Sequence, residues 1–200
     1  MPPSCVGSVI QKPGPEPTTR AEFLKYSREI TVDPNTANRY LLLSDRNRKV
    51  ERMKQQRFYP DHPDRFTGWY QVLSKESLTG RCYWEVEWRR GVDVAVSYKT
   101  ISRAGSSGEC GFGHNDKSWS LYCDTDICVF QHNKTETLVS GRPPSKVGVY
   151  LDHRAGVLSF YSVSDSMTLL HRVQTSFTQP LHAGAGLYGN GSTLEFIKAE

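Results

Sequence analysis

The sequence predicts an all-β fold, an antiparallel β-sandwich of two sheets with a short N-terminal helix. Three observations carry this prediction. Gly and Pro are frequent, with 16 and 11 of 200 residues, so the chain reverses often. Apolar residues recur at every second position in several short runs. No long amphipathic helix separates those runs, which argues against a parallel βαβ arrangement.

The N-terminal segment divides into a leader and a helix. Residues 1–18 contain five prolines and few apolar residues, which predicts an extended linker. Residues 19–22, Thr-Arg-Ala-Glu, fit a capping box in which the Thr19 hydroxyl and the Glu22 carboxylate each bind a free amide. Phe23, Tyr26 and Ile30 follow at near-helical spacing, so a short helix is expected here.

Two strands are predicted in the middle of the chain. Residues 82–88 alternate between apolar Cys, Trp, Val and Trp and more polar side chains, which is typical of a strand with one buried face. Gly91 indicates a turn, and residues 92–98 alternate again with Val, Val, Val and Tyr on one face. The simplest interpretation is a β-hairpin.

The C-terminal part predicts a second hairpin and a final strand. Residues 147–151 form one strand, residues 152–156 supply a short loop with Gly near its end, and residues 157–163 return as the partner. Residues 194–197, Leu-Glu-Phe-Ile, are expected to form a last strand that closes a sheet at the C-terminus.

Charge and cysteine content bound the functional classes. The net charge is +4, and residues 39–57 alone carry seven basic and two acidic side chains. This basic run could bind phosphates, but Asp45 and Glu51 are interleaved with its basic residues, so a solvated strand and turn is favoured over nucleic-acid binding. Five cysteines without a C-x-x-C, and no apolar leader, predict a reducing, cytoplasmic environment. No apolar run approaches the ~20 residues that span a bilayer.

Three patterns that could carry chemistry have simpler explanations. Residues 184–189 match G-x-G-x-x-G, but only a turn and a strand follow, which favours a glycine-rich strand over a nucleotide site. Cys110 with His114 and Cys128 with His132 leave a zinc site open, although residues 132–134 look like a hairpin tip. Glu85 and Glu87 lie on one face of a strand, which would suit a pair of glycosidase carboxylates, but the solvated faces of ordinary strands commonly carry such pairs. We therefore expect no metal, no cofactor and no catalytic residue.

Several ordered motifs resemble one known family. These are residues 31–38 (Thr-Val-Asp-Pro-Asn-Thr-Ala-Asn), 41–44 (Leu-Leu-Leu-Ser), 83–87 (Tyr-Trp-Glu-Val-Glu), 112–113 (Phe-Gly), 118–121 (Ser-Trp-Ser-Leu), 147–152 (Val-Gly-Val-Tyr-Leu-Asp) and 155–161 (Ala-Gly-Val-Leu-Ser-Phe-Tyr). In this order they resemble the PRY-SPRY (B30.2) module over about residues 20–197. Residues 59–66 resemble the version in fish tripartite-motif proteins, fish NOD-like receptors and relatives of the stonefish toxin.

The resemblance implies a bent two-sheet sandwich, with a PRY part at about 20–66 and a SPRY part at about 80–197 within a domain spanning 19–200. Such modules recognise another protein through variable loops on a rigid scaffold, and they often follow RING, B-box and coiled-coil parts. These residues contain no RING-type array of Cys and His and no heptad run. The resemblance therefore assigns them no ligase or ATPase activity.

The resemblance also implies candidate binding residues. The positions after the Ser-Trp-Ser-Leu strand line the partner pocket in tripartite-motif relatives, and the loop after residues 179–181 supplies another wall. We expect a shallower, more polar pocket than in relatives with bulky aromatics, and partner contacts from loops around 36–48, 98–109, 122–134 and 179–191. The candidate residues are Tyr122, Asp124, Ala183, Ala185, Asn38, Arg39, Arg46, Lys99, Arg103 and His132.

The leading hypothesis is a non-catalytic, monomeric module that binds another protein, in innate immunity or ubiquitin-system targeting, without contact to a membrane. The alternative is the substrate-targeting arm of an E3 ubiquitin ligase of the tripartite-motif type.

Overall fold

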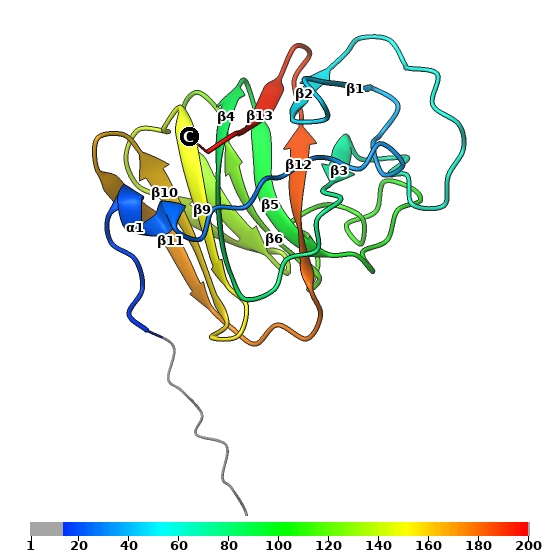
Figure 1. Cartoon of the computed structure of the whole chain (residues 1–200). Helices are drawn as coiled ribbons and strands as arrows, with labels where there is room; N and C mark the ends of the chain where they lie inside the picture. The colour runs from blue at the N-terminus through cyan, green and yellow to red at the C-terminus, as the bar shows by residue number, and fades with distance from the viewer. Residues whose placement is uncertain (1–13, 200) are drawn as a thin grey trace, which may run out of the picture.

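The computed structural model describes residues 14–199 as two packed antiparallel sheets and one short helix, which confirms the predicted fold class (Figure 1). In chain order the elements are α1 (Arg20–Leu24), β1 (Leu41–Ser44), β2 (Lys49–Arg52), β3 (Gln71–Leu73), β4 (Arg81–Arg89), β5 (Val92–Tyr98), β6 (Ser118–Cys123), β7 (Cys128–His132), β8 (Thr135–Val139), β9 (Lys146–Asp152), β10 (Val157–Val163), β11 (Met167–Gln174), β12 (Leu181–Leu187) and β13 (Thr193–Ile197).

The strands divide into a seven-stranded sheet with the order β1-β2-β13-β4-β9-β10-β11 and a six-stranded sheet with the order β3-β12-β5-β6-β7-β8. Apolar side chains from the inner faces of both sheets form one large core. Trp84 and Val86 enter it from the first sheet, and Val94 and Val96 from the second. This burial of apolar surface is the main favourable contribution to the stability of the sandwich.

Strand β5 is buried on both faces, although its sequence predicts only one apolar face. A second, smaller cluster of Phe66, Leu73, Ile101 and Phe112 packs over Ala95 on the outer side of β5. The loops that follow β2 and β5 therefore act as a third layer on this part of the sheet.

The capping box at Thr19 is confirmed: the Thr19 hydroxyl accepts a hydrogen bond from the backbone N–H of Glu22, and the Glu22 side chain binds back to the Thr19 N–H. The helix ends at Leu24, so Tyr26 and Ile30 lie beyond it despite their spacing. Phe23 is buried against Tyr83 and Tyr150, which holds α1 on the outer face of the seven-stranded sheet.

The predicted hairpin of residues 82–88 and 92–98 is wrong. Strand β4 pairs with β13 and β9, whereas β5 pairs with β12 and β6 in the other sheet. The chain crosses between sheets at Arg90 and Gly91, which both have positive φ angles. Both strands face the same core from opposite sides, so their alternation fits either arrangement.

The hairpin of β9 and β10 is confirmed, with Val157 opposite Asp152. The C-terminal strand forms as predicted, but β13 lies between β2 and β4 rather than closing the sheet at its edge. It thereby joins the first two strands to the remainder of the seven-stranded sheet.

The predicted linker lies largely outside the described residues, but the carbonyl oxygens of Gly14 and Pro15 accept hydrogen bonds from Arg81 of β4. Pro17 is buried, and Glu16 pairs with Arg172 of β11 at 2.5 Å. Within residues 14–199 no helix has the length and apolar character needed to cross a membrane.

The cysteines differ from the expectation of reduced thiols. Cys123 and Cys128, at the adjoining ends of β6 and β7, form a disulfide, while Cys82 and Cys110 are buried free thiols. Cys5 lies outside the described residues. An odd number of cysteines is compatible with one bonded pair. The spacing of the cysteines did not reveal this pair, because residues 123 and 128 face each other only once β6 and β7 are paired.

Candidate functional site

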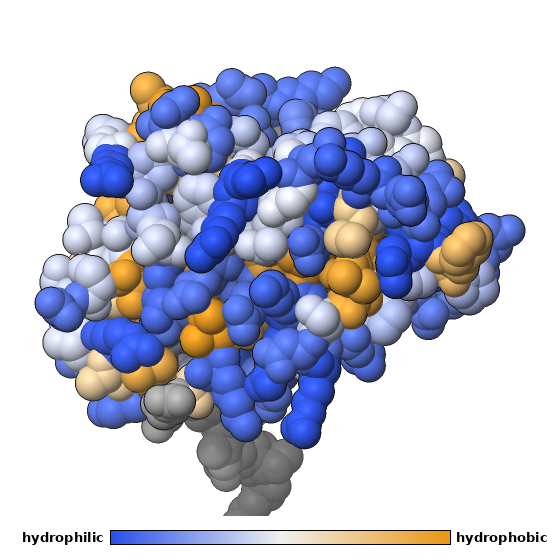
Figure 2. Space-filling view, turned by 90° about the horizontal axis from the view of Figure 1, so that it is seen from above, coloured by the Kyte–Doolittle hydropathy of each residue, from blue (hydrophilic) through white to orange (hydrophobic). Residues whose placement is uncertain are grey.

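Four chain connections meet at one end of the sandwich. Strand register fixes this arrangement, because Val92 lies opposite both Leu187 and Cys123, and Cys128 lies opposite both Cys123 and Val139. The connections that adjoin these strand ends are residues 90–91, 124–127, 140–145 and 188–192. We call this set the loop end. It is the upper end in Figure 1, and Figure 2 views it from above, showing a mainly hydrophilic surface with scattered hydrophobic patches.

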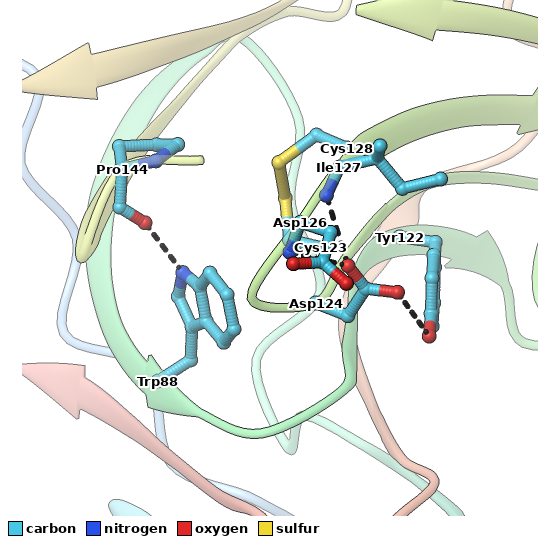
Figure 3. Close-up of a disulfide and its surroundings, with 8 residues drawn as sticks. All are labelled: Trp88, Tyr122, Cys123, Asp124, Asp126, Ile127, Cys128 and Pro144. Carbon is cyan, nitrogen blue, oxygen red and sulfur yellow. Dashed lines mark hydrogen bonds between the residues drawn. A yellow bond between two sulfur atoms is a disulfide. The ribbon is translucent and has the colours of Figure 1, made fainter. Parts of the chain in front are cut away.

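The connection from β6 to β7 is held rigidly. The disulfide closes its base, and the Asp124 carboxylate accepts hydrogen bonds from the backbone N–H groups of Asp126 and Ile127 at 2.8 and 2.9 Å (Figure 3). These N–H groups lower the pKa of Asp124, so the side chain is ionised at neutral pH. A loop fixed in this way loses little conformational entropy when it binds.

Tyr122 connects this loop to a buried polar layer. Its hydroxyl donates to Asp124 Oδ2 at 3.2 Å, and its ring packs edge-on against Tyr188, with ring centroids 5.6 Å apart. Tyr188 in turn donates its hydroxyl to Oδ2 of Asp93, a completely buried carboxyl group. Burial raises the pKa of Asp93 to about 6, although the hydrogen bond from Tyr188 partly opposes that shift.

Two glycines in β12 allow side chains from neighbouring segments to pack closely against this strand. A Cβ atom on Gly186 of β12 would lie 3.0 Å from Asp93 Oδ2, and one on Gly184 would lie 2.8 Å from the Phe112 ring. The G-x-G-x-x-G pattern therefore serves close packing within a strand, as the sequence favoured, and no helix follows it within the described residues.

A groove lies beside this loop, between the end of β4 and the β8–β9 connection. We call it the Trp88 groove; it is lined by Trp88, Arg89, Arg90, Asp124, Thr125, Arg142, Pro143, Pro144 and Ser145. The Trp88 indole N–H donates to the Pro144 carbonyl oxygen at 2.9 Å, which fixes the ring against the connection (Figure 3). Sequence reasoning placed Trp88 in the core and did not select these three arginines. The Arg-Arg-Gly at a predicted turn was the available signal.

The candidate residues do not form one site. Tyr122 and Asp124 lie together at the loop end, joined by a hydrogen bond, and their contact with a partner stays a prediction. The prediction that Ala183 and Ala185 contact a partner is wrong, because both side chains are completely buried within β12. The predicted loop after residues 179–181 is a strand, so the second wall of the predicted pocket does not exist in that form.

Four further candidates are engaged within the fold. Asn38 is buried and binds the carbonyl oxygens of Phe66 and Thr67, which corrects its assignment as a contact residue. Arg103 donates to three backbone carbonyl groups, those of Lys99, Ile101 and Asp64. Arg39 pairs with Asp61 and also donates to the Tyr59 carbonyl oxygen. His132 stacks on Trp119 with ring centroids 4.6 Å apart.

Arg46 and Lys99 are exposed but lie away from the loop end, in the β1–β2 turn and just after β5. The predicted binding loops likewise divide between two ends: residues 99–117 and 133–134 lie opposite the loop end, since they adjoin the other ends of β5, β6 and β7.

The remaining chemical motifs are structural. Cys128 is bonded to Cys123, so the zinc arrangement is contradicted, and residues 14–199 contain no cluster of three or more metal-binding side chains. Glu85 is buried, binds Arg20 through two hydrogen bonds of 2.9 Å and accepts one from Tyr83. Glu87 is exposed and pairs with Lys146 at 3.6 Å. The two carboxylates therefore have separate partners.

Comparison with known families decides the classification. The SPRY domain model matches residues 81–199, and the model of the SPRY-associated domain PRY matches residues 30–78. The chain belongs to the PRY-SPRY (B30.2) family.

Known members of the family support this assignment in sequence and in structure. Tripartite motif-containing protein 16 of Mus musculus is 42% identical over 92% of the chain, and stonustoxin subunit alpha of Synanceia horrida is 38% identical over 89%. The chain spans only 34% and 26% of their lengths. The TRIM65 PSpry domain superposes with a TM-score of 0.82 at 29% identity, covering 94% of this chain and all of that one. A stonustoxin structure gives a TM-score of 0.84 at 35% identity, covering 90% of this chain and 30% of that one.

The chain is similar to SPRY domains of the tripartite-motif type, and this similarity is consistent with a protein-interaction module. It does not select a binding surface, for which the geometry of the loop end is the relevant observation.

Proposed function

We propose that this PRY-SPRY chain is a non-catalytic module that binds another protein through the loop end, centred on Tyr122 and Asp124. The observation that carries the proposal is a surface loop that three hydrogen bonds to the Asp124 carboxylate fix before binding; the disulfide at its base adds to this wherever conditions are oxidising. A pre-formed surface of this kind suits specific recognition, because little ordering is needed.

We further propose that the chain is monomeric and acts in innate immune or ubiquitin-system targeting. In this proposal it binds neither nucleic acid nor a membrane. The proposal also includes a cytoplasmic location. Reducing conditions there would convert Cys123 and Cys128 to thiols, whereas an oxidising compartment would preserve their bond. Alkylation of rapidly quenched cell extracts, followed by mass spectrometry of the 123–128 segment, distinguishes the two states.

A pull-down from cell lysate tests the binding surface. The wild-type chain is compared with Tyr122→Ala/Asp124→Ala and with a control, Lys99→Ala/Arg46→Ala, which removes exposed side chains away from the loop end. We expect partners captured by wild type and by the control to be lost with the Tyr122/Asp124 variant. Identical partner lists for all three folded proteins would overturn the proposed surface.

A second candidate function is the substrate-targeting arm of an E3 ubiquitin ligase, which the similarity to tripartite-motif proteins favours. It uses the same surface, so it is tested by identifying the full-length reading frame: a RING-type cysteine array upstream of residue 1 supports it, and a different upstream domain argues against it.

A further inference from the structure

The Trp88 groove carries three arginines that the fold itself leaves without ionic partners. Arg89, Arg90 and Arg142 are exposed, and within residues 14–199 none of them has a carboxylate oxygen within 4.0 Å. Arg90 uses one nitrogen to donate to the Asn190 carbonyl oxygen at 3.0 Å, which positions its side chain without neutralising it.

The only acidic side chain lining the groove among the described residues does not compensate these charges. Asp124 accepts hydrogen bonds from Tyr122, Asp126 and Ile127, and no arginine contacts it. The groove is therefore lined by three arginines and by one carboxylate that is already hydrogen-bonded within its own loop, which leaves this part of the surface electropositive.

The shape of the groove favours an extended chain. A second hollow, lined by Lys49, Glu87, Thr193 and Glu195, shares Trp88, Arg89 and Ser145 with the first, so the two hollows adjoin each other near the ends of β13, β4 and β9. The second hollow is lined by two cations, Lys49 and Arg89, and by two carboxylates, Glu87 and Glu195, of which Glu87 pairs with Lys146. Positive charge is therefore concentrated at the Arg142 end, while the middle offers the Trp88 ring and Pro144.

We propose that the Trp88 groove binds an extended acidic segment of the partner protein, with its carboxylates paired to Arg89, Arg90 and Arg142. Guanidinium groups bind carboxylates through two parallel hydrogen bonds, which makes arginine well suited to this recognition. This inference rests on the proposed function, because the groove adjoins the Tyr122–Asp124 surface through Asp124 itself.

Fluorescence anisotropy with a fluorescein-labelled hexaglutamate peptide tests the inference. We expect the 200-residue chain to bind it at 50 mM NaCl, to bind it more weakly at 200 mM NaCl, and not to bind hexaglutamine. The triple variant Arg89→Gln/Arg90→Gln/Arg142→Gln is expected to bind hexaglutamate at least tenfold more weakly than wild type.

The matched control is Arg46→Gln/Lys54→Gln/Arg57→Gln, which removes the same charge from exposed positions elsewhere. We expect it to bind hexaglutamate like wild type. Equal losses in both triple variants, or no binding by wild type at 50 mM NaCl, would overturn the inference. Labelled oligouridine that binds through the same three arginines as tightly as hexaglutamate would also overturn it, in favour of nucleic acid.

The pull-down described above separates the two proposals. Loss of partners with the Tyr122/Asp124 variant, together with no binding of hexaglutamate, would leave the proposed function intact and remove the acidic segment. Unchanged partners with that variant but tenfold weaker hexaglutamate binding by the groove variant would retain the groove and reject the Tyr122–Asp124 surface.

Discussion

Arginines in two regions of this domain are engaged by the fold to different extents. In the PRY part, three of the five arginines of the dense basic run are engaged, Arg39 with Asp61, Arg48 with Glu29 and Asp45, and Arg52 stacked 3.4 Å from the Tyr70 ring centroid, whereas the other two are exposed. In the Trp88 groove only three arginines occur, and all lack an ionic partner within the described residues. Charge density along the sequence is therefore a poor guide to charge available for binding, because folding neutralises cations that find partners.

Arg65 gives the sharpest contrast with the groove. It is 3% exposed and donates to the carbonyl oxygens of Pro34, Ala37 and Pro60 at 2.7–3.1 Å. Arg65→Met leaves these three oxygens unpaired, so we expect the free energy of unfolding to fall by roughly 4 kcal/mol. Urea denaturation measures it. Arg142→Met is the control and should change stability by less than ~0.5 kcal/mol; similar losses in both variants would end the distinction between the two regions.

Acidic groups offer the same comparison, since Asp93 is buried beneath the loop end and Asp124 lies on it. The folded protein retains the Asp93 proton up to a pH of about 6, whereas the unfolded chain loses it near its ordinary pKa of 3.8. Stability should therefore fall as the pH rises from about 4 to about 6, by on the order of 3 kcal/mol from this group. Asp93→Asn should remove that decrease. Denaturation curves at pH 4.5, 5.5 and 6.5 that remain parallel for the two proteins would contradict the assignment.

The disulfide tests how far the loop end depends on a covalent closure. Opening a loop of this size in Cys123→Ser/Cys128→Ser should cost about 2 kcal/mol. The hydrogen bonds of Asp124 remain, so we expect the fold to persist and the loop to become more mobile. Thermal denaturation measures the loss, and Cys110→Ser is a control for removing a thiol. An unchanged melting temperature in the double variant would show that strand pairing alone fixes the loop.

The smallest effect is expected for the groove arginines themselves. Arg89→Gln/Arg90→Gln/Arg142→Gln removes exposed charges that have no ionic partner among the described residues, so its free energy of unfolding should stay within ~0.5 kcal/mol of wild type. Urea denaturation of this variant checks the value. A loss above 1.5 kcal/mol would mean that these side chains stabilise the fold, which contradicts their description as free.

Local features were predictable where the interaction partners are close in sequence. The capping box at Thr19 joins residues three positions apart, and the β9–β10 hairpin needs only a four-residue connection. The β4–β5 hairpin failed although its turn is shorter, because an alternating pattern identifies a buried face but not the sheet to which the strand belongs.

The candidate site shows the same limit. Tyr122 and Asp124 followed from a family motif carried over position by position, and the structure places them together. Ala183 and Ala185 followed from the same reasoning and are buried, because β12 continues through the positions where a loop was expected. The arginines of the Trp88 groove come from β4, the β4–β5 turn and the β8–β9 connection, so no single stretch of sequence revealed them.

The sequence by itself determined the strand-rich class, the N-terminal cap and the family, since each depends on short motifs and local periodicity. The tertiary structure alone decided which strands are neighbours, which two cysteines bond and which arginines have an ionic partner within residues 14–199. These properties depend on contacts between residues far apart in the chain. A charge, a thiol or a strand edge is available to a partner only if no distant part of the same molecule has already satisfied it.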